Sequence, residues 1–135
     1  MLARREHASA EVTASLVRKG YDAGIAVAVV AELLDERLLD DTRYADALVR
    51  MLAGRGQGPR RVRQALVEAG VPESLISAAM DAGPDWRALA AEVRQRKFGS
   101  VLPKTWPQRA RQMRFLQYRG FSNDHIGSSL TDMDS

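Results

Sequence analysis

The sequence contains no cysteine in its 135 residues. Without thiols the chain cannot form a disulfide framework, a thiolate metal site or a cysteine nucleophile. Long apolar runs are also missing, because no stretch approaches the ~20 consecutive apolar residues of a membrane span. Charged residues interrupt the N-terminus at positions 4 to 6, so this segment lacks the apolar core of a signal peptide. We expect a cytoplasmic protein with no membrane partner.

Strand patterns are absent as well. Apolar residues do not alternate with polar ones between turn residues but recur at helical spacing, which predicts an all-α protein. Helices are expected over residues 8–19, 23–37, 42–53, 59–69, 72–82, 86–97, 107–119 and 123–131.

An internal repeat with a period of fifty residues is the most informative feature present. Each copy has a leucine, a glycine four positions later and then a large apolar residue. A fixed long period indicates one structural unit used several times, and such arrays usually present binding surfaces rather than one catalytic pocket. The copies are Leu16, Gly20 and Tyr21; Leu66, Gly70 and Val71; and Leu116, Gly120 and Phe121.

The repeated glycines are predicted to end helices in the left-handed conformation, which glycine reaches without a Cβ clash. Asp22 and Ser122 follow where the next helix needs an N-cap acceptor. Pro72 fits the first helical position, where its missing N–H costs nothing. Each repeat therefore contains a helix, a glycine turn and a second helix.

A further amphipathic helix precedes this pair in the second and third repeats, so the predicted unit has three helices. We expect one domain, 1–135, forming an elongated, curved helical array with repeats at about 1–40, 41–83 and 84–135. Only Met1 to Arg5 precede the first pair, so the first repeat is expected to lack its leading helix.

The start of the first predicted helix has a weak cap. Ala8 stands where the second repeat has Gly58. Alanine supplies no capping oxygen, which costs ~1 kcal/mol of helix stability against serine unless Ser9 takes over with a shifted start. We expect residues 1–12 to fray and the last five residues to be loose. Hydrogen exchange as slow in residues 1–12 as in residues 60–80 would contradict the first expectation.

The glycine triplet Gly54, Gly56 and Gly58 could suggest a phosphate cradle at a helix start. No Lys-Ser or Lys-Thr pair follows it and no strand precedes it, so a nucleotide site is disfavoured against a flexible interhelical turn. An ordered anion at the start of the helix that follows remains an alternative.

Other candidate catalytic or metal-binding residues are few. Asp40 and Asp41 precede a predicted helix, where carboxylates cap free N–H groups, so we interpret them as a cap rather than an acid–base pair. His7 and His125 have no partner in a recognisable motif. No catalytic residue, metal ion or cofactor is expected.

Charge is unevenly distributed along the chain. Residues 1–50 contain seven Arg or Lys and nine Asp or Glu, whereas residues 51–119 contain thirteen and five. In the helix predicted over residues 107–119, Arg111, Arg114 and Tyr118 share one stripe, while Ala110, Met113 and Leu116 can face inward. This basic face is either a binding surface for a nucleic acid or acidic protein, or a solvated surface where arginines cluster. The predicted partner-binding residues are Arg60, Arg61, Arg63, Arg94, Arg96, Lys97, Arg109, Arg111, Arg114, Tyr118 and Arg119.

An ordered set of segments resembles the RecX family of bacterial regulators of the RecA recombinase, and the resemblance covers nearly the whole chain. Two departures are visible: family members usually begin with a further helix, and Ala8 replaces the usual serine. The segments are LARREHASAEVTASLVRKGY, LLDDTRYADALVR, GQGPRRVRQALVEAGV, RQRKFG and RFLQYRGFS.

The resemblance implies a non-enzymatic modulator built of tandem three-helix repeats. Family members lie in the groove of the RecA filament on single-stranded DNA and restrain its ATPase, strand exchange, coprotease activity and growth, so a role in recombination and the SOS response is implied. A monomer is expected. The alternative is a helical module that binds single- or double-stranded DNA directly, without RecA. No family motif assigns contact residues, so the arginines above rest on the charge argument alone.

Overall fold

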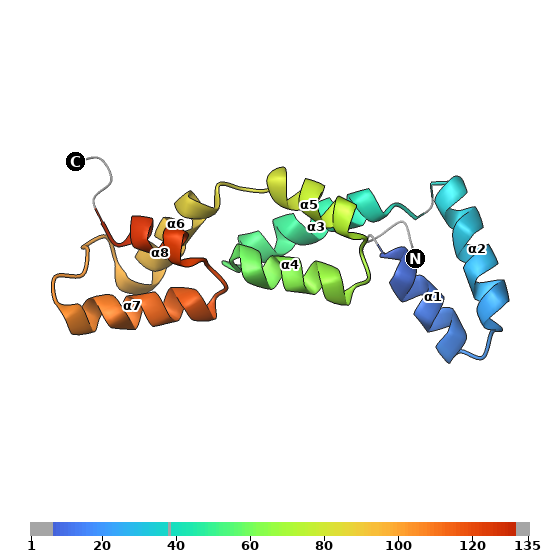
Figure 1. The fold of residues 1–135 in the computed structure, drawn as a ribbon, viewed down its shortest axis with the longest axis horizontal. Helices are drawn as coiled ribbons and strands as arrows, with labels where there is room; N and C mark the ends of the chain where they lie inside the picture. Colours follow the sequence, from blue (N-terminus) through green and yellow to red (C-terminus); the bar gives the residue numbers. More distant parts are fainter. Residues whose placement is uncertain (1–6, 38, 132–135) are drawn as a thin grey trace. The chain divides into compact units, whose positions relative to one another are not determined.

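The computed structural model describes residues 7–37 and 39–131, and within these it contains eight α-helices and no strand. The all-α prediction is confirmed, and every predicted helix is present with its ends shifted by no more than two residues. The helices are α1 (Ser9–Arg18), α2 (Ala23–Asp35), α3 (Asp41–Gly54), α4 (Pro59–Glu68), α5 (Glu73–Asp81), α6 (Trp86–Phe98), α7 (Trp106–Tyr118) and α8 (Asn123–Ser129) (Figure 1).

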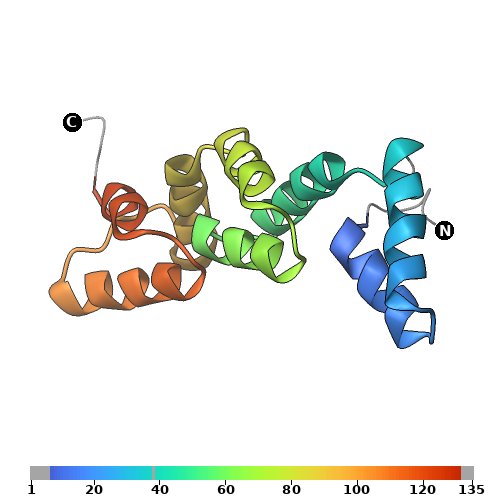
Figure 2. The ribbon, with the colours of Figure 1, turned by 45° about the vertical axis from the view of Figure 1, so that its right-hand side comes forward.

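The chain divides into two compact units, and the division falls within α3 and α4. The N-terminal unit combines the residues up to Val49 with Gln64–Ala82, and the C-terminal unit combines Arg50–Arg63 with the residues from Gly83 onward. In the first, α1 and α2 lie side by side as a helical hairpin (Figures 1 and 2). In the second, α6, α7 and α8 pack together. The repeat boundaries named above stay a prediction.

The fifty-residue repeat is a repeated helix C-cap. The three glycines have φ values of 101°, 81° and 98°, so the predicted left-handed conformation is confirmed. In each copy the N–H of the residue after the glycine donates to the carbonyl of the repeated leucine at 3.1 Å, and the glycine N–H donates three residues back at 3.0 Å. This pair of bonds defines the Schellman motif, in which an apolar contact joins the leucine to the residue after the glycine. Hydrogen bonding at the helix end thus explains the repeated glycine, and the apolar pair is buried in the second and third copies, whereas Tyr21 of the first copy is exposed.

Both predicted N-caps, Asp22 and Ser122, are confirmed. The Asp22 carboxylate accepts from the N–H groups of Gly24 and Ile25, and the Ser122 hydroxyl accepts from His125 N–H. The placement of Pro72 is wrong by one residue, because it is the N-cap of α5, with ψ at 146°, and α5 begins at Glu73. A proline is tolerated at either position, since neither N–H has a partner within the helix.

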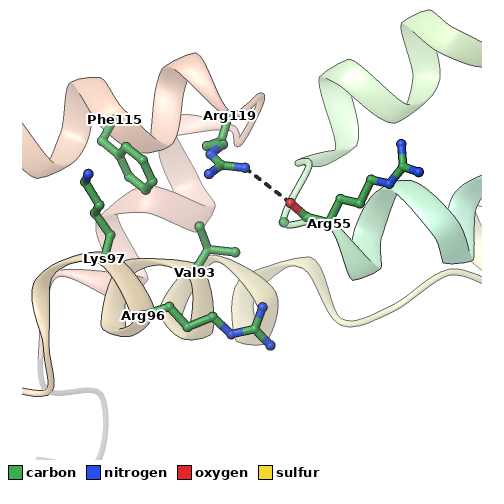
Figure 3. A pocket seen from close by; sticks show the side chains of 7 residues that line it. Arg55, Val93, Arg96, Lys97, Phe115 and Arg119 are labelled. Atoms are coloured by element: carbon green, nitrogen blue, oxygen red, sulfur yellow. Dashed lines mark hydrogen bonds between the residues drawn. The ribbon is translucent and has the colours of Figure 1, made fainter.

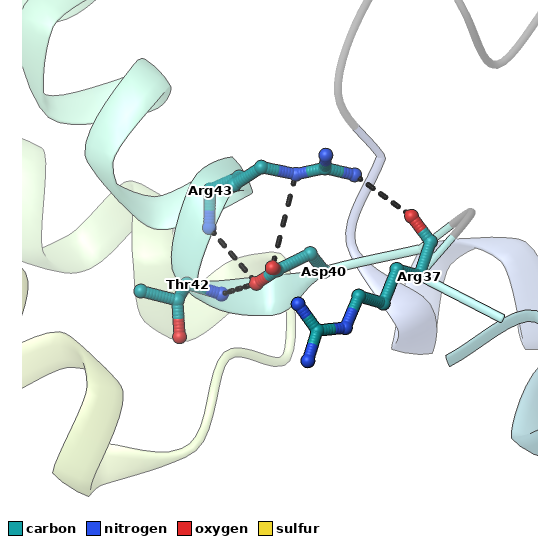
Figure 4. Close-up of polar contacts among 4 residues, drawn as sticks. All are labelled: Arg37, Asp40, Thr42 and Arg43. Atoms are coloured by element: carbon teal, nitrogen blue, oxygen red, sulfur yellow. Dashed lines mark hydrogen bonds and ion pairs between the residues drawn. The ribbon is translucent and has the colours of Figure 1, made fainter. Parts of the chain in front are cut away.

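The Asp40–Asp41 pair acts as two separate caps. Asp40 Oδ1 accepts from Thr42 N–H at 2.9 Å and Arg43 N–H at 3.1 Å, which caps α3 (Figure 4). Arg43 also lies 3.8 Å from the other Asp40 oxygen and donates to the carbonyl of Arg37, which has a left-handed φ of 60°. The cap interpretation is confirmed for Asp40.

Asp41 instead holds the start of α1. Its Oδ1 accepts from Ser9 N–H at 2.7 Å and its Oδ2 accepts from the Ser9 hydroxyl at 2.6 Å. Ala8 is the N-cap without a side-chain bond, as expected, but it is 1% exposed, and Glu11 accepts from its N–H. Residues 1–6 of the segment expected to fray, and all but the first residue of the tail, lie outside the described residues. Because of the Asp41 contact, we now expect residues 8–12 to be protected.

The core of the C-terminal unit brings α6, α7 and α8 together through the third Schellman motif. Leu116 and Phe121, the two apolar residues of that motif, are completely buried. Met113 and Phe115 pack against this core as partly buried residues. The remaining buried members are Ala90, Val93, Ile126 and Leu130.

Candidate partner-binding surface

All of the predicted partner-binding residues belong to the C-terminal unit. The stripe on α7 is placed as predicted: Arg111, Arg114 and Tyr118 are exposed, while Leu116 is buried. Ala110 and Met113, predicted to face inward, are half-buried. Since α7 contains no acidic residue, the stripe has no carboxylate of its own helix to neutralise it.

The other predicted residues lie on neighbouring helices with different exposure. On α4, Arg60, Arg61 and Arg63 are exposed. Arg96 and Lys97 are exposed in the last turn of α6, where cations also favour the helix dipole. Arg109 and Arg119 are half-buried.

Arg94 is wrongly assigned to the exposed surface. It is 2% exposed, and its Nη1 donates to the Gly99 carbonyl at 3.3 Å, while its Nε has no hydrogen-bond partner within the described part of the chain. Burial lowers the pKa of the Arg94 guanidinium below its ordinary value, because removal from water disfavours the charged form. Helical periodicity alone did not distinguish this arginine from its exposed neighbours.

A pocket of about 190 Å³ opens between the ends of α6 and α7 and the turn after α3. Val93 and Phe115 provide its apolar surface, and Arg55, Arg96, Lys97 and Arg119 contribute cationic residues to its lining (Figure 3). Arg119 is fixed by donating to the Arg55 carbonyl at 3.2 Å. None of the described residues that line the pocket is a carboxylate, although Glu92 pairs with Arg96 nearby. The arrangement suits a ligand that combines an anionic group with an apolar or planar surface.

Cations and aromatic rings alternate around this pocket. Lys97 Nζ lies 5.8 Å and the Arg119 guanidinium 5.3 Å from the centre of the Phe115 ring. Phe98 meets the same ring edge-to-face at 5.3 Å, and Arg111 lies 5.8 Å from the centre of Phe98. These contacts hold long cationic side chains near an apolar surface, so less side-chain entropy is lost when they bind an anion.

The start of α4 does not offer a free anion site. Gly58 N–H donates to the Arg119 carbonyl at 2.7 Å, and Arg60 N–H donates to the Gly120 carbonyl at 2.9 Å. An added Cβ at Gly58 would lie 2.5 Å from the Gly120 carbonyl carbon, so the two backbones touch. The alternative of an ordered anion at this helix start is therefore wrong: carbonyl oxygens from the end of α7 take the place of the anion.

The place where the start of α4 meets the end of α7 is called the joint below. It also carries a stacked pair, in which the Arg61 guanidinium lies on the Tyr118 ring. The guanidinium carbon of Arg61 lies 4.5 Å from the centre of the Tyr118 ring, and Arg61 Nη1 donates to Gln57 at 3.3 Å. Tyr118 is 73% exposed, so its ring contributes little to the core.

Fifty residues earlier, the N-terminal unit has a different surface at the equivalent joint. Glu11 and Glu68 occupy the positions equivalent to Arg61 and Tyr118, and both line a pocket of about 290 Å³ with Arg18 and Gly70. An added Cβ at Gly70 would lie 2.5 Å from Ala10 Cβ, so these segments also meet closely, without a stacked pair. Of these two joints, only the one in the C-terminal unit is both basic and aromatic.

Sequence reasoning missed Arg55, Phe98 and Phe115 as members of the surface. Arg55 stands in the glycine-rich turn, where only the glycines were considered. Phe115 was passed over because it lies on the same helix as residues expected to face inward. Among residues 7–37 and 39–131 no cluster of histidine or acidic residues could hold a metal ion. In the same residues, no helix has the length and apolar composition needed to cross a membrane.

Two models of RecX domains match the chain: the second three-helix domain over residues 40–80 and the third over residues 85–128. Proteins named Regulatory protein RecX are similar along almost its whole length. Those of Halorhodospira halophila and Vibrio campbellii are each 41% identical over 99% of this chain, which covers 84% and 87% of their lengths.

Solved structures show the same fold. The crystal structure of RecX from Lactobacillus salivarius superposes with a TM-score of 0.84 at 18% identity, over 98% of this chain and 89% of the other. A second crystal structure of regulatory protein RecX gives 0.75 at 20% identity, over 93% and 64% of the two chains. The domain matches and the extended sequence identity establish that this chain belongs to the RecX family of regulatory proteins.

Proposed function

We propose that this chain is a non-enzymatic regulator that binds the RecA filament on single-stranded DNA. In this role it restrains the ATPase, strand exchange and coprotease activities of RecA during recombination, DNA repair and the SOS response. It acts in the cytoplasm as a monomer. The observation that carries the proposal is membership of a family of regulatory proteins at 41% identity over nearly the whole chain.

The C-terminal unit supports this proposal chemically. Its exposed arginines lie on α4, α6 and α7, and its basic pocket has an apolar lining. A nucleoprotein filament offers both phosphates and acidic protein side chains, and arginine binds either as a bidentate donor. The pocket of Figure 3 would accept one such anionic group.

The direct test adds this protein to RecA that is hydrolysing ATP on single-stranded DNA. We expect the steady-state ATPase rate to fall and the filaments seen by electron microscopy to shorten. An unchanged rate together with unchanged filament length would refute the proposal.

A second candidate is a helical module that binds DNA directly, without RecA. The thirteen basic and five acidic residues between positions 51 and 119 favour it. Phosphate contacts would make binding to bare DNA fall steeply as salt rises. Salt-independent binding, or none, would rule against this candidate.

A further inference from the structure

The most exposed aromatic residue described in the C-terminal unit has a cation over one face of its ring. Tyr118 is 73% exposed, against 69% for Trp106, although the Arg61 guanidinium lies over its ring. Since one face is covered, the exposed area must come mainly from the opposite face and the edges. Tyr118 therefore presents a flat ring to solvent on the last turn of α7.

The ring and its supporting cation are held on a rigid joint. The hydrogen bonds from Gly58 and Arg60 to the end of α7 fix α4 against the turn that follows Tyr118. An added Cβ at Gly120 would lie 2.7 Å from Arg61 Cγ, so the stem of Arg61 packs directly on that turn. A binding group held by packing keeps its geometry and loses little entropy when a ligand arrives.

Folding does not explain why this pair is present. At the equivalent joint of the N-terminal unit, Glu11 and Glu68 occupy the two positions, and the Schellman motif forms there with the same 3.1 Å bond, from Val71 to Leu66. The two segments also meet closely there, because an added Cβ at Gly70 would lie 2.5 Å from Ala10 Cβ, and they do so with two exposed carboxylates. The arginine–tyrosine pair is a feature of the C-terminal surface and not a requirement of the repeat.

The surroundings of the ring are cationic. Arg114 lies four residues before Tyr118 and Arg111 lies seven before it, so the three side chains follow one face of α7. A ring beside several arginines is the combination that holds single-stranded nucleic acid: the base stacks on the ring and the cations contact phosphates. A duplex does not fit this site, because its base faces are already stacked on one another.

We propose that the open face of Tyr118 stacks against an unpaired base of a single-stranded nucleic acid, with Arg61 supporting the ring and Arg111 and Arg114 contacting phosphates. The inference rests on the proposed function, since a regulator of a filament on single-stranded DNA meets unpaired bases there. It specifies one chemical role, base stacking, at one residue.

The test compares a fluorescent oligothymidine with an abasic oligomer of the same length, both titrated with the full chain by anisotropy. Tyr118→Ala should weaken binding to the thymidine oligomer about tenfold or more and leave binding to the abasic oligomer unchanged. Tyr118→Phe keeps a ring and should bind as the wild type does. Tyr21→Ala is the matched control, because Tyr21 is also exposed, at 56%, but belongs to the N-terminal unit.

Three results would overturn the stacking role: no binding of the thymidine oligomer by the wild type, equal losses on both oligomers, or no loss on either. Tyr118→Leu, which removes the ring but keeps an apolar side chain on α7, provides a second variant, and circular dichroism confirms that each variant is folded. If Tyr118→Ala weakens inhibition of the RecA ATPase but not binding to bare oligomer, Tyr118 contacts protein and the stacking proposal fails. An ATPase that the wild type leaves unchanged refutes the proposed function instead, whatever the oligomers show.

Discussion

Ser9 and Asp41 form a two-point contact: the Ser9 N–H donates to one carboxylate oxygen at 2.7 Å and its hydroxyl donates to the other at 2.6 Å. The contact joins the first residue of α1 to the first residue of α3. It satisfies one of the free N–H groups at the start of α1, where the N-cap Ala8 has no side-chain acceptor.

Asp41→Ala should therefore destabilise the start of α1. Loss of two hydrogen bonds to a charged, half-buried acceptor should lower the free energy of unfolding by about 2 kcal/mol, measured by urea denaturation. Hydrogen exchange should quicken in residues 9–13. Glu32→Ala, an exposed acidic residue on α2, is the control and should change neither quantity; equal effects of the two variants would contradict the role given to Asp41.

Local patterns predicted the helices because most helix ends are encoded within a few residues. The Schellman glycines and the caps at Asp22, Asp40 and Ser122 need only neighbouring residues to form. The same reasoning could not find contacts between distant segments. Ser9 and Asp41 are 32 residues apart, and the bond from Arg119 to the Arg55 carbonyl spans 64 residues.

The candidate surface was predicted only in part, because some of its features depend on contacts between distant segments. Helical spacing placed Arg111, Arg114 and Tyr118 on one exposed stripe, which depends on α7 alone. Burial of Arg94 depends on the residues packed around it, and capping of α4 by carbonyls depends on the end of α7. Neither is visible in the periodicity of one helix.

Gly58→Ala should disrupt the joint between α4 and the end of α7. The new Cβ would lie 2.5 Å from a backbone carbon that cannot move without breaking the neighbouring hydrogen bonds. We expect a loss of about 3 kcal/mol in unfolding free energy. Gly54→Ala is the matched control, because in the last position of α3 its Cβ meets no atom of the described part of the chain within 4 Å. This variant should be neutral or slightly stabilising.

Gly70→Ala and Gly20→Ala separate backbone strain from steric clash. Both glycines have positive φ, where an alanine is strained. The free energy of unfolding should therefore fall by about 1 kcal/mol in both variants. At Gly70 the new Cβ would also lie 2.5 Å from Ala10 Cβ, whereas at Gly20 it meets no described residue within 4 Å. Gly70→Ala should therefore show the lower melting temperature, and Gly70→Val one lower still. Equal melting temperatures for the two alanine variants would mean that Ala10 moves aside without a measurable cost in stability.

Arg94→Met should preserve or raise stability, although it removes a charge. Asp40 caps α3 and Asp85 caps α6, so the two helices can be aligned on their caps. Nine residues after the cap, α6 has Arg94 and α3 has Val49, which is buried at 2% exposure. The equivalent site thus accepts an apolar residue. Methionine removes the cost of burying a guanidinium whose Nε has no partner among the described residues, and the exposed Gly99 carbonyl can bind water instead. We expect an unfolding free energy higher by about 1 kcal/mol; a clear loss would show that the charge stabilises the fold.

Arg111→Glu combined with Arg114→Glu should weaken binding to single-stranded DNA and to the RecA filament without changing helical content. Both side chains are exposed on α7 and no acidic residue of that helix balances them, so reversal removes two phosphate or carboxylate contacts. The slope of log affinity against log salt should fall by about two. Arg18→Glu with Lys19→Glu makes the same change in net charge on the N-terminal unit and should have a much smaller effect. Equal losses for the two double variants would mean that overall charge, and not the α7 stripe, governs binding.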